Sequence, residues 1–315
     1  MCVNAGCRQT DLDTRTWHQP ETRGSPLPEA RAGHSGTVVA SMDADASCAP
    51  SLVIFGGHAV NGSLSDVYSL RITSAAAREV AGGGRGGGGG GQGGGGRFVA
   101  QWHQLDDGSG GGPSSRGGHC AVNVEEGGEA GGLLVFGGED QGGACMGDLW
   151  LFDVAAVSWR RVSCSGGGPG RRVDSRMVKM GASIVLYGGS LDSRALDDIW
   201  LLCPKTWTWT TLSACSSVSP GPRAGYTAAV FGGEMLVLGG GDGHQGLHGV
   251  FSLKLAQQSD VEQAAEEGKP ARAEWSIVRA GYSHSTRGLT VAREVRNPKH
   301  QTLNPKPETR NPKPF

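Results

Sequence analysis

The stretch from Asp242 to His248 holds the densest group of side chains that could perform chemistry. Asp242, His244 and His248 lie close together in a glycine-rich segment. Carboxylate and imidazole groups are ligands for iron and zinc, and this short spacing would let one loop supply all of them. A metal-dependent enzyme is therefore one function that the sequence raises.

Acidic and histidine side chains also follow other apolar runs in the chain. The candidates for a binding surface are His58, Glu139, Asp140, Asp192, Asp242 and His244. Carboxylates gathered on one face would attract a basic peptide or protein. The alternative is that each is an ordinary solvated turn residue, because aspartate and asparagine are favoured in turns for their local hydrogen bonds.

Other catalytic patterns are missing from the sequence. No Ser-His-Asp order, phosphate-binding loop or pair of catalytic carboxylates stands in a convincing context. The 8 cysteines are scattered and form no Cys-x-x-Cys pair, which indicates reduced thiols in an intracellular protein. We therefore predict a protein that is not an enzyme, with no catalytic residue, metal or cofactor.

The elements that position these residues repeat along the chain. A pair of glycines ends a short apolar run at four places: Gly56 and Gly57, Gly137 and Gly138, Gly188 and Gly189, and Gly239 and Gly240. An arginine precedes each pair, at Arg31, Arg116, Arg172 and Arg223, and a tryptophan follows each, at Trp102, Trp159, Trp209 and Trp275. Apolar runs in a repeated unit of about 50 residues indicate a repeated four-stranded sheet.

A third feature of the repeat is an acidic, apolar, aromatic step after the glycines. It reads Asp66-Val-Tyr68, Asp148-Leu-Trp150 and Asp198-Ile-Trp200, and the last unit has Gly249-Val-Phe251 instead. Together with the double glycine and the spaced tryptophan, this step resembles the kelch repeat over roughly residues 7 to 290. The resemblance implies an all-β fold, a β-propeller whose blades are four antiparallel strands.

The repeated positions are expected to be structural. The double glycine ends a strand where the backbone must turn or approach a neighbour closely, which glycine does without steric cost. The tryptophan gives each sheet a large apolar body to bury. We expect the arginine to form hydrogen bonds within or between blades, because a residue present in every unit serves what every unit needs.

The repeat also predicts the organisation of the chain. We expect residues 1–20 to supply the last two strands of a partial blade, and residues 21–290 to form four complete blades that start near the arginines. A flexible glycine-rich insert at 82–97 and a polar insert at 256–273 interrupt them. Residues 291–315 read as a disordered low-complexity tail. With only a partial fifth blade, the sequence suggests an incomplete or truncated member of the family.

Charge and hydropathy limit the partners. The chain has 29 basic and 30 acidic residues, so no basic surface favours nucleic acid. No apolar stretch approaches a membrane span and no signal peptide is recognisable, so we expect a cytoplasmic protein without membrane contact.

These observations favour a protein-interaction scaffold without catalytic activity. Its variable loops would present the binding surface to a protein or peptide partner, in a larger assembly that selects substrates. The alternative is a metal-dependent enzyme or specifier protein, since some propellers that resemble this family bind copper or ferrous iron.

Overall fold

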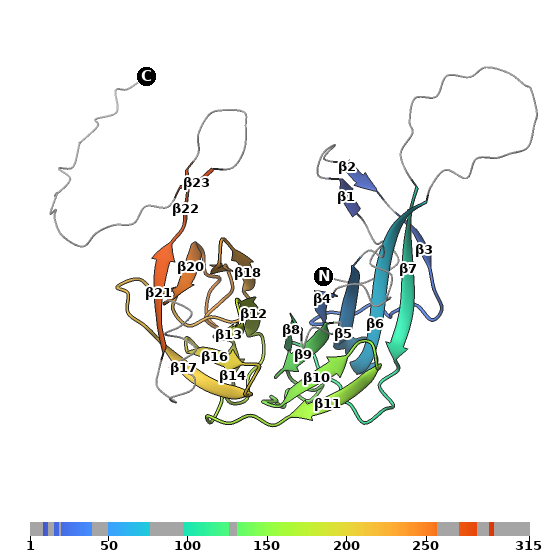
Figure 1. Ribbon diagram of the computed structural model, residues 1–315, viewed down its shortest axis with the longest axis horizontal. Helices are drawn as coiled ribbons and strands as arrows, with labels where there is room; N and C mark the ends of the chain where they lie inside the picture. Colours follow the sequence, from blue (N-terminus) through green and yellow to red (C-terminus); the bar gives the residue numbers. More distant parts are fainter. Residues whose placement is uncertain are drawn as a thin grey trace, which may run out of the picture. The chain divides into compact units, whose positions relative to one another are not determined.

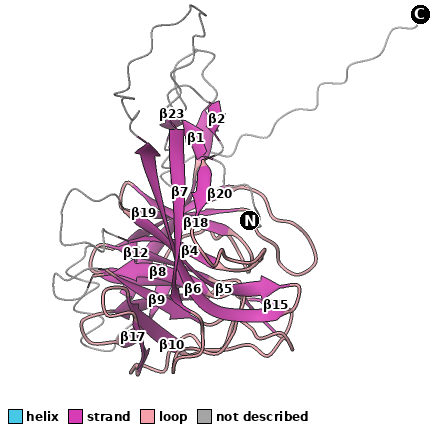
Figure 2. Cartoon of the chain, turned by 90° about the vertical axis from the view of Figure 1, so that its right-hand side faces the viewer, coloured by secondary structure: helices cyan, strands magenta, loops and turns pink. Residues whose placement is uncertain are grey.

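The computed structural model describes residues 9–11, 16–18, 20–39, 50–75, 97–125, 131–256, 271–281 and 290–292. The chain divides into two compact units, Met1–Ile277 and Val278–Phe315. The described residues form strands and loops, with no helix among them (Figure 2), so the all-β prediction is confirmed. Residues 82–96 of the predicted glycine-rich insert, residues 257–270 of the polar insert and residues 293–315 of the predicted tail lie outside the described part.

Four groups of four antiparallel strands, which we call blades A to D, make up most of the first unit (Figure 1). Blade A contains β4 (Ser35–Val39), β5 (Ser51–Ala59), β6 (Gly62–Ala75) and β7 (Arg97–Asp106). Blade B contains β8 (Cys120–Val124), β9 (Gly132–Phe136), β10 (Leu149–Asp153) and β11 (Ser158–Val162). Blade C contains β12 (Arg176–Met180), β13 (Ser183–Tyr187), β16 (Ile199–Cys203) and β17 (Thr208–Ala214). Blade D contains β18 (Thr227–Phe231), β19 (Glu234–Leu238), β20 (Val250–Leu255) and β21 (Ala271–Ile277).

The second strand of each blade is the apolar run that precedes a double glycine. Every residue of β9 and β13 is buried. A strand covered on both faces by neighbouring sheets has no solvent side, which explains continuous apolar runs in place of alternation. The glycines that follow have positive φ, for example 69° at Gly137 and 94° at Gly138.

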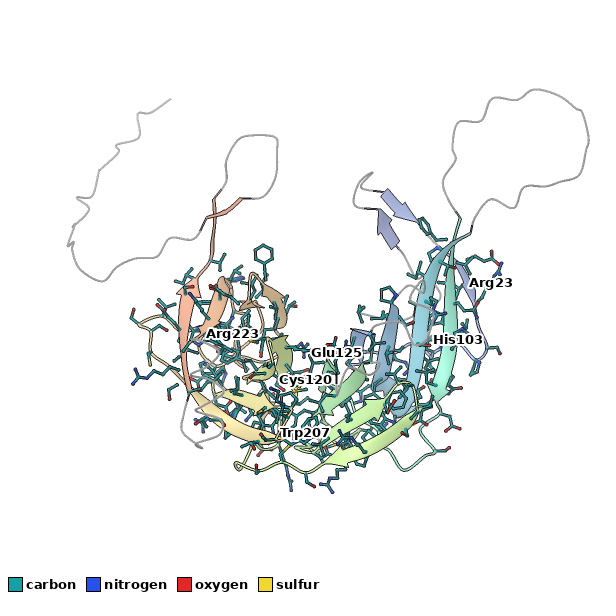
Figure 3. The ribbon with its side chains drawn as sticks, in the orientation of Figure 1. Arg23, His103, Cys120, Glu125, Trp207 and Arg223 are labelled. Atoms are coloured by element: carbon teal, nitrogen blue, oxygen red, sulfur yellow. The ribbon has the colours of Figure 1, made fainter. Side chains whose placement is uncertain are left out.

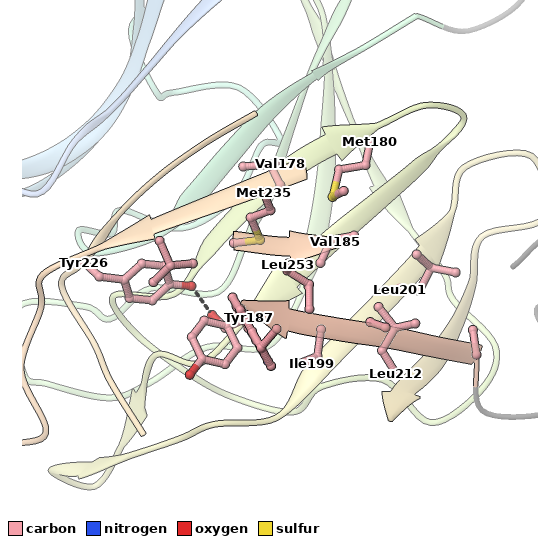
Figure 4. Close-up of a cluster of buried hydrophobic side chains, with 14 residues drawn as sticks. Val178, Met180, Val185, Tyr187, Ile199, Leu201, Leu212, Tyr226, Met235 and Leu253 are labelled. Atoms are coloured by element: carbon pink, nitrogen blue, oxygen red, sulfur yellow. Dashed lines mark hydrogen bonds between the residues drawn. The ribbon is translucent and has the colours of Figure 1, made fainter. Parts of the chain in front are cut away.

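Successive blades pack through their faces and touch through their first strands. Contacts join β4 to β8, β8 to β12 and β12 to β18. Between blades A and B, Phe55 packs with Trp159 at a ring-centroid distance of 5.0 Å. Between blades B and C, Phe136 packs with Trp209 at 5.7 Å, and between blades C and D, Tyr187 packs with Trp275 at 5.1 Å. The repeated tryptophan therefore fills the space between blades, and Figure 4 shows part of the cluster between blades C and D.

Parallel pairing along the outer strands also ties segments together. The short strand β3 (Glu21–Arg23) pairs in parallel with β7, outside the four strands of blade A. The end of β17 pairs in parallel with the start of β21, which joins blades C and D into one eight-stranded sheet. A residue after β11, Ser165, pairs in parallel with Thr208 of β17. The chain at the end of the outer strand of blade B or C thus runs beside the outer strand of the following blade.

Several element boundaries differ from the sequence expectation. β7 begins at Arg97 and β21 at Ala271, both inside the predicted inserts. β5 continues past the double glycine to Ala59 and β6 begins at Gly62, so only two residues separate these strands. The pairing that extends these strands includes His58 with Ser63, beyond a bulge at Gly56.

Short strand pairs lie near both ends of the chain. β1 (Gln9–Asp11) and β2 (Thr16–His18) are antiparallel and belong to the first unit. In the second unit, β22 (Arg279–Gly281) pairs with β23 (Thr290–Ala292). A partial fifth blade built from terminal segments remains a prediction.

Candidate functional site

The loops between the second and third strands contact one another from blade to blade. A Cβ atom placed on Gly62 in blade A, which marks the open side of its backbone, would lie 3.2 Å from Gln141 Oε1 in blade B. The Cys145 thiol of blade B interacts with the backbone N–H of Asp192 in blade C. The Ser193 carbonyl oxygen of blade C lies 3.0 Å from the Cβ position of Gly243 in blade D. These loops therefore form one continuous surface, which we call the loop face.

Backbone hydrogen bonds hold the start of each loop in place. The residue after each double glycine pairs with the residue after the arginine of the same blade: Ala32 with His58, Gly117 with Glu139, Val173 with Ser190, and Ala224 with Gly241. Each bond is between backbone groups, so the side chains at these positions are free to vary. The frame of the loop face is thus independent of its surface chemistry.

Buried arginine side chains anchor the same loops from below. Arg116 Nη1 lies 2.6 Å from Asp148 Oδ1, and Arg172 Nη1 lies 2.7 Å from Asp198 Oδ1. Each aspartate also accepts a hydrogen bond at Oδ2 from the indole of the tryptophan two residues later, Trp150 or Trp200. Burial raises the pKa of Asp148, but the hydrogen bonds from Arg116 and Trp150 outweigh it and hold that pKa below its ordinary value.

Two acidic candidates use their carboxylates inside their own loops. Asp140 Oδ1 accepts hydrogen bonds from the backbone N–H groups of Gly142 and Ala144, at 2.8 and 2.9 Å. Asp242 Oδ1 accepts them from His244 and Gln245, both at 2.8 Å. The bonds from Gln245 and His244 lower the pKa of Asp242, which keeps it ionised at neutral pH. Each carboxylate therefore shapes its turn and still presents negative charge to solvent.

A groove of about 480 Å³ lies between the loops of blades C and D. Asp192, Asp242 and His244 all line it, so the structure brings these three sequence candidates together. Its other lining residues are Ser193, Arg194, Ala195, Pro220, Gly221, Pro222 and Leu247. The groove thus has two carboxylates on its walls, with one guanidinium and one imidazole beside them.

The other three candidates lie outside this groove. Glu139 and Asp140 are in the blade B loop and are half-buried. His58 packs its ring against the backbone of Gly117, and its Nδ1 lies 2.9 Å from Ser63 Oγ. That placement gives His58 a packing role at the boundary between blades A and B.

Sequence reasoning missed the proline segment of the groove. Pro220 and Pro222 lie in the connection from blade C to blade D. A signal was available, since proline stands three residues before every repeated arginine, at Pro28, Pro113, Pro169 and Pro220. In two blades the carbonyl of that proline accepts a hydrogen bond from the arginine, Arg172 or Arg223. Fixed φ at proline gives this connection a defined path.

Metal chemistry at Asp242, His244 and His248 receives no support from this geometry. Oδ1 of Asp242 already accepts hydrogen bonds from two N–H groups of its own loop. Within the described ranges, no group of three His, Cys, Asp or Glu side chains is arranged to hold a metal ion.

The described residues also contain no helix that could span a membrane.

Known proteins resemble this chain over its repeats. It is 27% identical over 174 residues to acyl-CoA-binding domain-containing protein 5 of Arabidopsis thaliana, covering 54% of this chain and 26% of the relative. It is 30% identical over 112 residues to dynein regulatory complex subunit 7 of Chlamydomonas reinhardtii, covering 34% and 10%. It is 24% identical over 144 residues to host cell factor of Drosophila melanogaster, covering 44% and 9%. The chain therefore spans about a quarter or less of the length of these relatives.

A family model covers more of the chain than any of these three alignments. The model of the KLHDC2/KLHL20/DRC7 Kelch-repeats domain matches residues 99–282, which is more than half of the 315 residues. This range includes most of the last strand of blade A and all of blades B, C and D. With the buried arginines, the double glycines and the four-stranded sheets, the match shows that the chain belongs to the KLHDC2/KLHL20/DRC7 Kelch-repeats domain family.

Proposed function

We propose that this chain is a protein-interaction scaffold without catalytic activity, and that its loop face binds a basic segment of a protein partner. The observation that carries the proposal is the groove between blades C and D, whose walls hold the Asp192 and Asp242 carboxylates. Family membership supports the general role, because function in a repeat fold is supplied by variable loops on a common frame.

The geometry of the groove suits an extended basic peptide. It is open to solvent, and its lining includes the segment from Pro220 to Pro222, in which each proline has a fixed φ. Asp192 and Asp242 stand in turns held by local hydrogen bonds, and their carboxylates would attract a lysine or arginine side chain that enters the groove. Arg194 and His244 beside them would select against a uniformly basic ligand and favour one with an acidic or polar neighbour.

The proposal includes a cytoplasmic location and a role as the recognition part of a larger assembly. Five cysteines of the described part, Cys120, Cys145, Cys164, Cys203 and Cys215, are free thiols. Free thiols persist in the cytosol, where glutathione and thioredoxin keep them reduced.

Peptide display tests the proposal without a known partner. The purified chain selects from a library of random peptides displayed on phage, and each selected peptide is then measured by calorimetry against Asp192→Asn/Asp242→Asn. Asparagine keeps the carbonyl oxygen that holds the Asp242 turn, and at both positions it removes the negative charge at nearly unchanged size. We expect selected peptides to contain lysine or arginine and to lose about tenfold in affinity.

The matched control is Asp153→Asn/Glu234→Gln. Asp153 and Glu234 stand beside the turns at the other ends of the strands, and Asp153 also accepts hydrogen bonds within its turn. This double variant removes the same charge away from the loop face. Equal weakening in both double variants, or selected peptides without basic residues, would contradict the proposal.

A further inference from the structure

Blades A, B and C neutralise a buried arginine in the same way. Arg31, Arg116 and Arg172 each bind one aspartate with Nη1 and Nη2, at distances between 2.5 and 3.0 Å. In each case Nη1 also donates to the carbonyl of the first glycine of the pair, Gly56, Gly137 or Gly188. Nη1 therefore donates to two acceptors, the aspartate and the glycine carbonyl, while Nη2 donates to the second oxygen of the aspartate.

Blade D keeps the arginine and lacks the aspartate. Arg223 Nη1 donates to the Gly239 carbonyl at 2.8 Å, and Nη2 donates to the Pro220 carbonyl. Gly249 stands where the other blades have aspartate, and no carboxylate of the described residues forms an ion pair with Arg223. Nε donates to the Gly221 carbonyl at 3.4 Å, the Phe251 ring lies 5.1 Å from the guanidinium carbon, and the Tyr187 hydroxyl is also close. Figure 3 labels Arg223 in this blade.

This arrangement leaves a buried positive charge without a counter-charge in the described chain. Arg223 is only 2% exposed. A guanidinium does not lose its proton in proteins, so burial cannot be relieved by neutralisation. The Phe251 ring offsets part of the cost through a cation–π contact, which is weaker than a bidentate carboxylate.

The position of the missing carboxylate is open to solvent. In blade C the Asp198 side chain is 40% exposed although its partner Arg172 is 2% exposed. Gly249 is exposed as well, and the three atoms nearest to its Cβ position all belong to the Phe251 ring, at 3.1 to 3.9 Å. A carboxylate from solution could therefore reach the place that aspartate fills in the other blades.

We propose that Arg223 is a binding site for a carboxylate group supplied by another molecule, which it holds with Nη1 and Nη2 as the other blades hold their aspartates. The source is either a free small carboxylate or an acidic side chain of a protein. This site goes beyond the proposed function, because it requires neither the groove nor a basic peptide.

Thermal unfolding and calorimetry of the full chain test the site. Sodium acetate is compared with sodium chloride at equal ionic strength, and N-acetyl-Gly-Glu-Gly-amide is compared with its glutamine counterpart. We expect acetate to raise the melting temperature above its value in chloride, or the glutamate peptide to bind about tenfold tighter than the glutamine one. The acetate effect identifies a free small carboxylate, and the peptide effect identifies an acidic side chain.

Two variants test whether the missing aspartate causes the response to the carboxylate probes. Gly249→Asp/Phe251→Trp supplies the aspartate and indole of blades B and C, at a backbone φ of 99° that residues other than glycine rarely adopt. We expect this variant to lose the response to both probes. Asp198→Gly/Trp200→Phe gives blade C the residues of blade D and should respond more strongly than the native chain. No response in the native chain, or an unchanged response in Gly249→Asp/Phe251→Trp, would overturn the proposal.

Discussion

The backbone carbonyl of Arg116 in blade B accepts a hydrogen bond from the N–H of Gly57 in blade A, at 2.8 Å. The same bond joins Gly138 to Arg172 and Gly189 to Arg223, both at 2.9 Å. Each arginine therefore acts twice. Its side chain holds the loop of its own blade, and its carbonyl fixes the double glycine of the preceding blade.

Removing the negative charge of Asp148 should destabilise the fold, because Arg116 is buried and would lose its counter-charge. We expect Asp148→Asn to lower the free energy of unfolding by about 2–4 kcal/mol, because Arg116 would keep its charge without a carboxylate. Urea unfolding at neutral pH measures the loss. Asp153→Asn is the control, since Asp153 is exposed and holds only its own turn, and its loss should stay below about 1 kcal/mol.

The pH dependence of the same pair has a defined sign. The pKa of Asp148 is lower in the folded chain than its ordinary value. Its stabilisation is therefore complete above the unfolded pKa of about 4 and is lost as pH falls through the folded pKa. Urea midpoints between pH 5 and pH 2.5 should fall less steeply for Asp148→Asn than for the native chain. Equal slopes would show that this carboxylate titrates alike in both states.

A methyl group on Gly188 should break the link between blades C and D. The Cβ position of Gly188 lies 2.6 Å from the Arg223 carbonyl oxygen, and its φ is 53°. We expect Gly188→Ala to destabilise the fold by about 3 kcal/mol or more, from clash and strain together. Gly232→Ala separates the two causes. Gly232 has a similar φ of 59° with open space at its Cβ position, so its loss should be about 1 kcal/mol.

The hydroxyl of Tyr226 joins blades C and D through two backbone groups. It donates to the Tyr187 carbonyl, the dashed line in Figure 4, and accepts from the N–H of Arg176 at 3.2 Å. We expect Tyr226→Phe to cost about 1–3 kcal/mol, because a buried carbonyl and a half-buried N–H would lose a hydrogen-bond partner. Tyr68→Phe is the control, as none of the described residues hydrogen-bonds to the Tyr68 hydroxyl. Similar losses from both variants would show that the ring and not the hydroxyl matters.

Buried His119 should make stability depend on pH above the carboxylate range. Burial, together with nearby Arg116, His34, Arg176 and His58, lowers its pKa from 6.5 to about 3. The pKa of this imidazole is lower in the folded chain than in the unfolded chain. As pH drops below the pKa in the unfolded chain, the unfolded chain takes up a proton that the folded chain does not, and the fold loses stability. Urea midpoints should fall from pH 7 to pH 5 in the native chain. We expect a flatter profile for His119→Gln over this range, and an unchanged slope would contradict the assignment.

Much of the fold could be predicted from local sequence. The apolar runs before the double glycines are the second strands of the blades, and the tryptophans lie in the fourth strands. Both follow from residue type and spacing, because each blade repeats the same local contacts. The place of Gly57 was also predictable, since a positive φ of 100° and a close approach to Ala32 require glycine.

Other features were decided only by tertiary structure. Asp192 and Asp242 share a groove because loops from separate blades meet, and no spacing rule connects them. Asp140 is apart from that groove although its turn closely resembles that of Asp242. Gly249 is visible in the sequence as a break in the repeat, but only the buried position of Arg223 shows that a carboxylate is missing. Periodicity specifies what every blade needs, and burial decides where one blade differs.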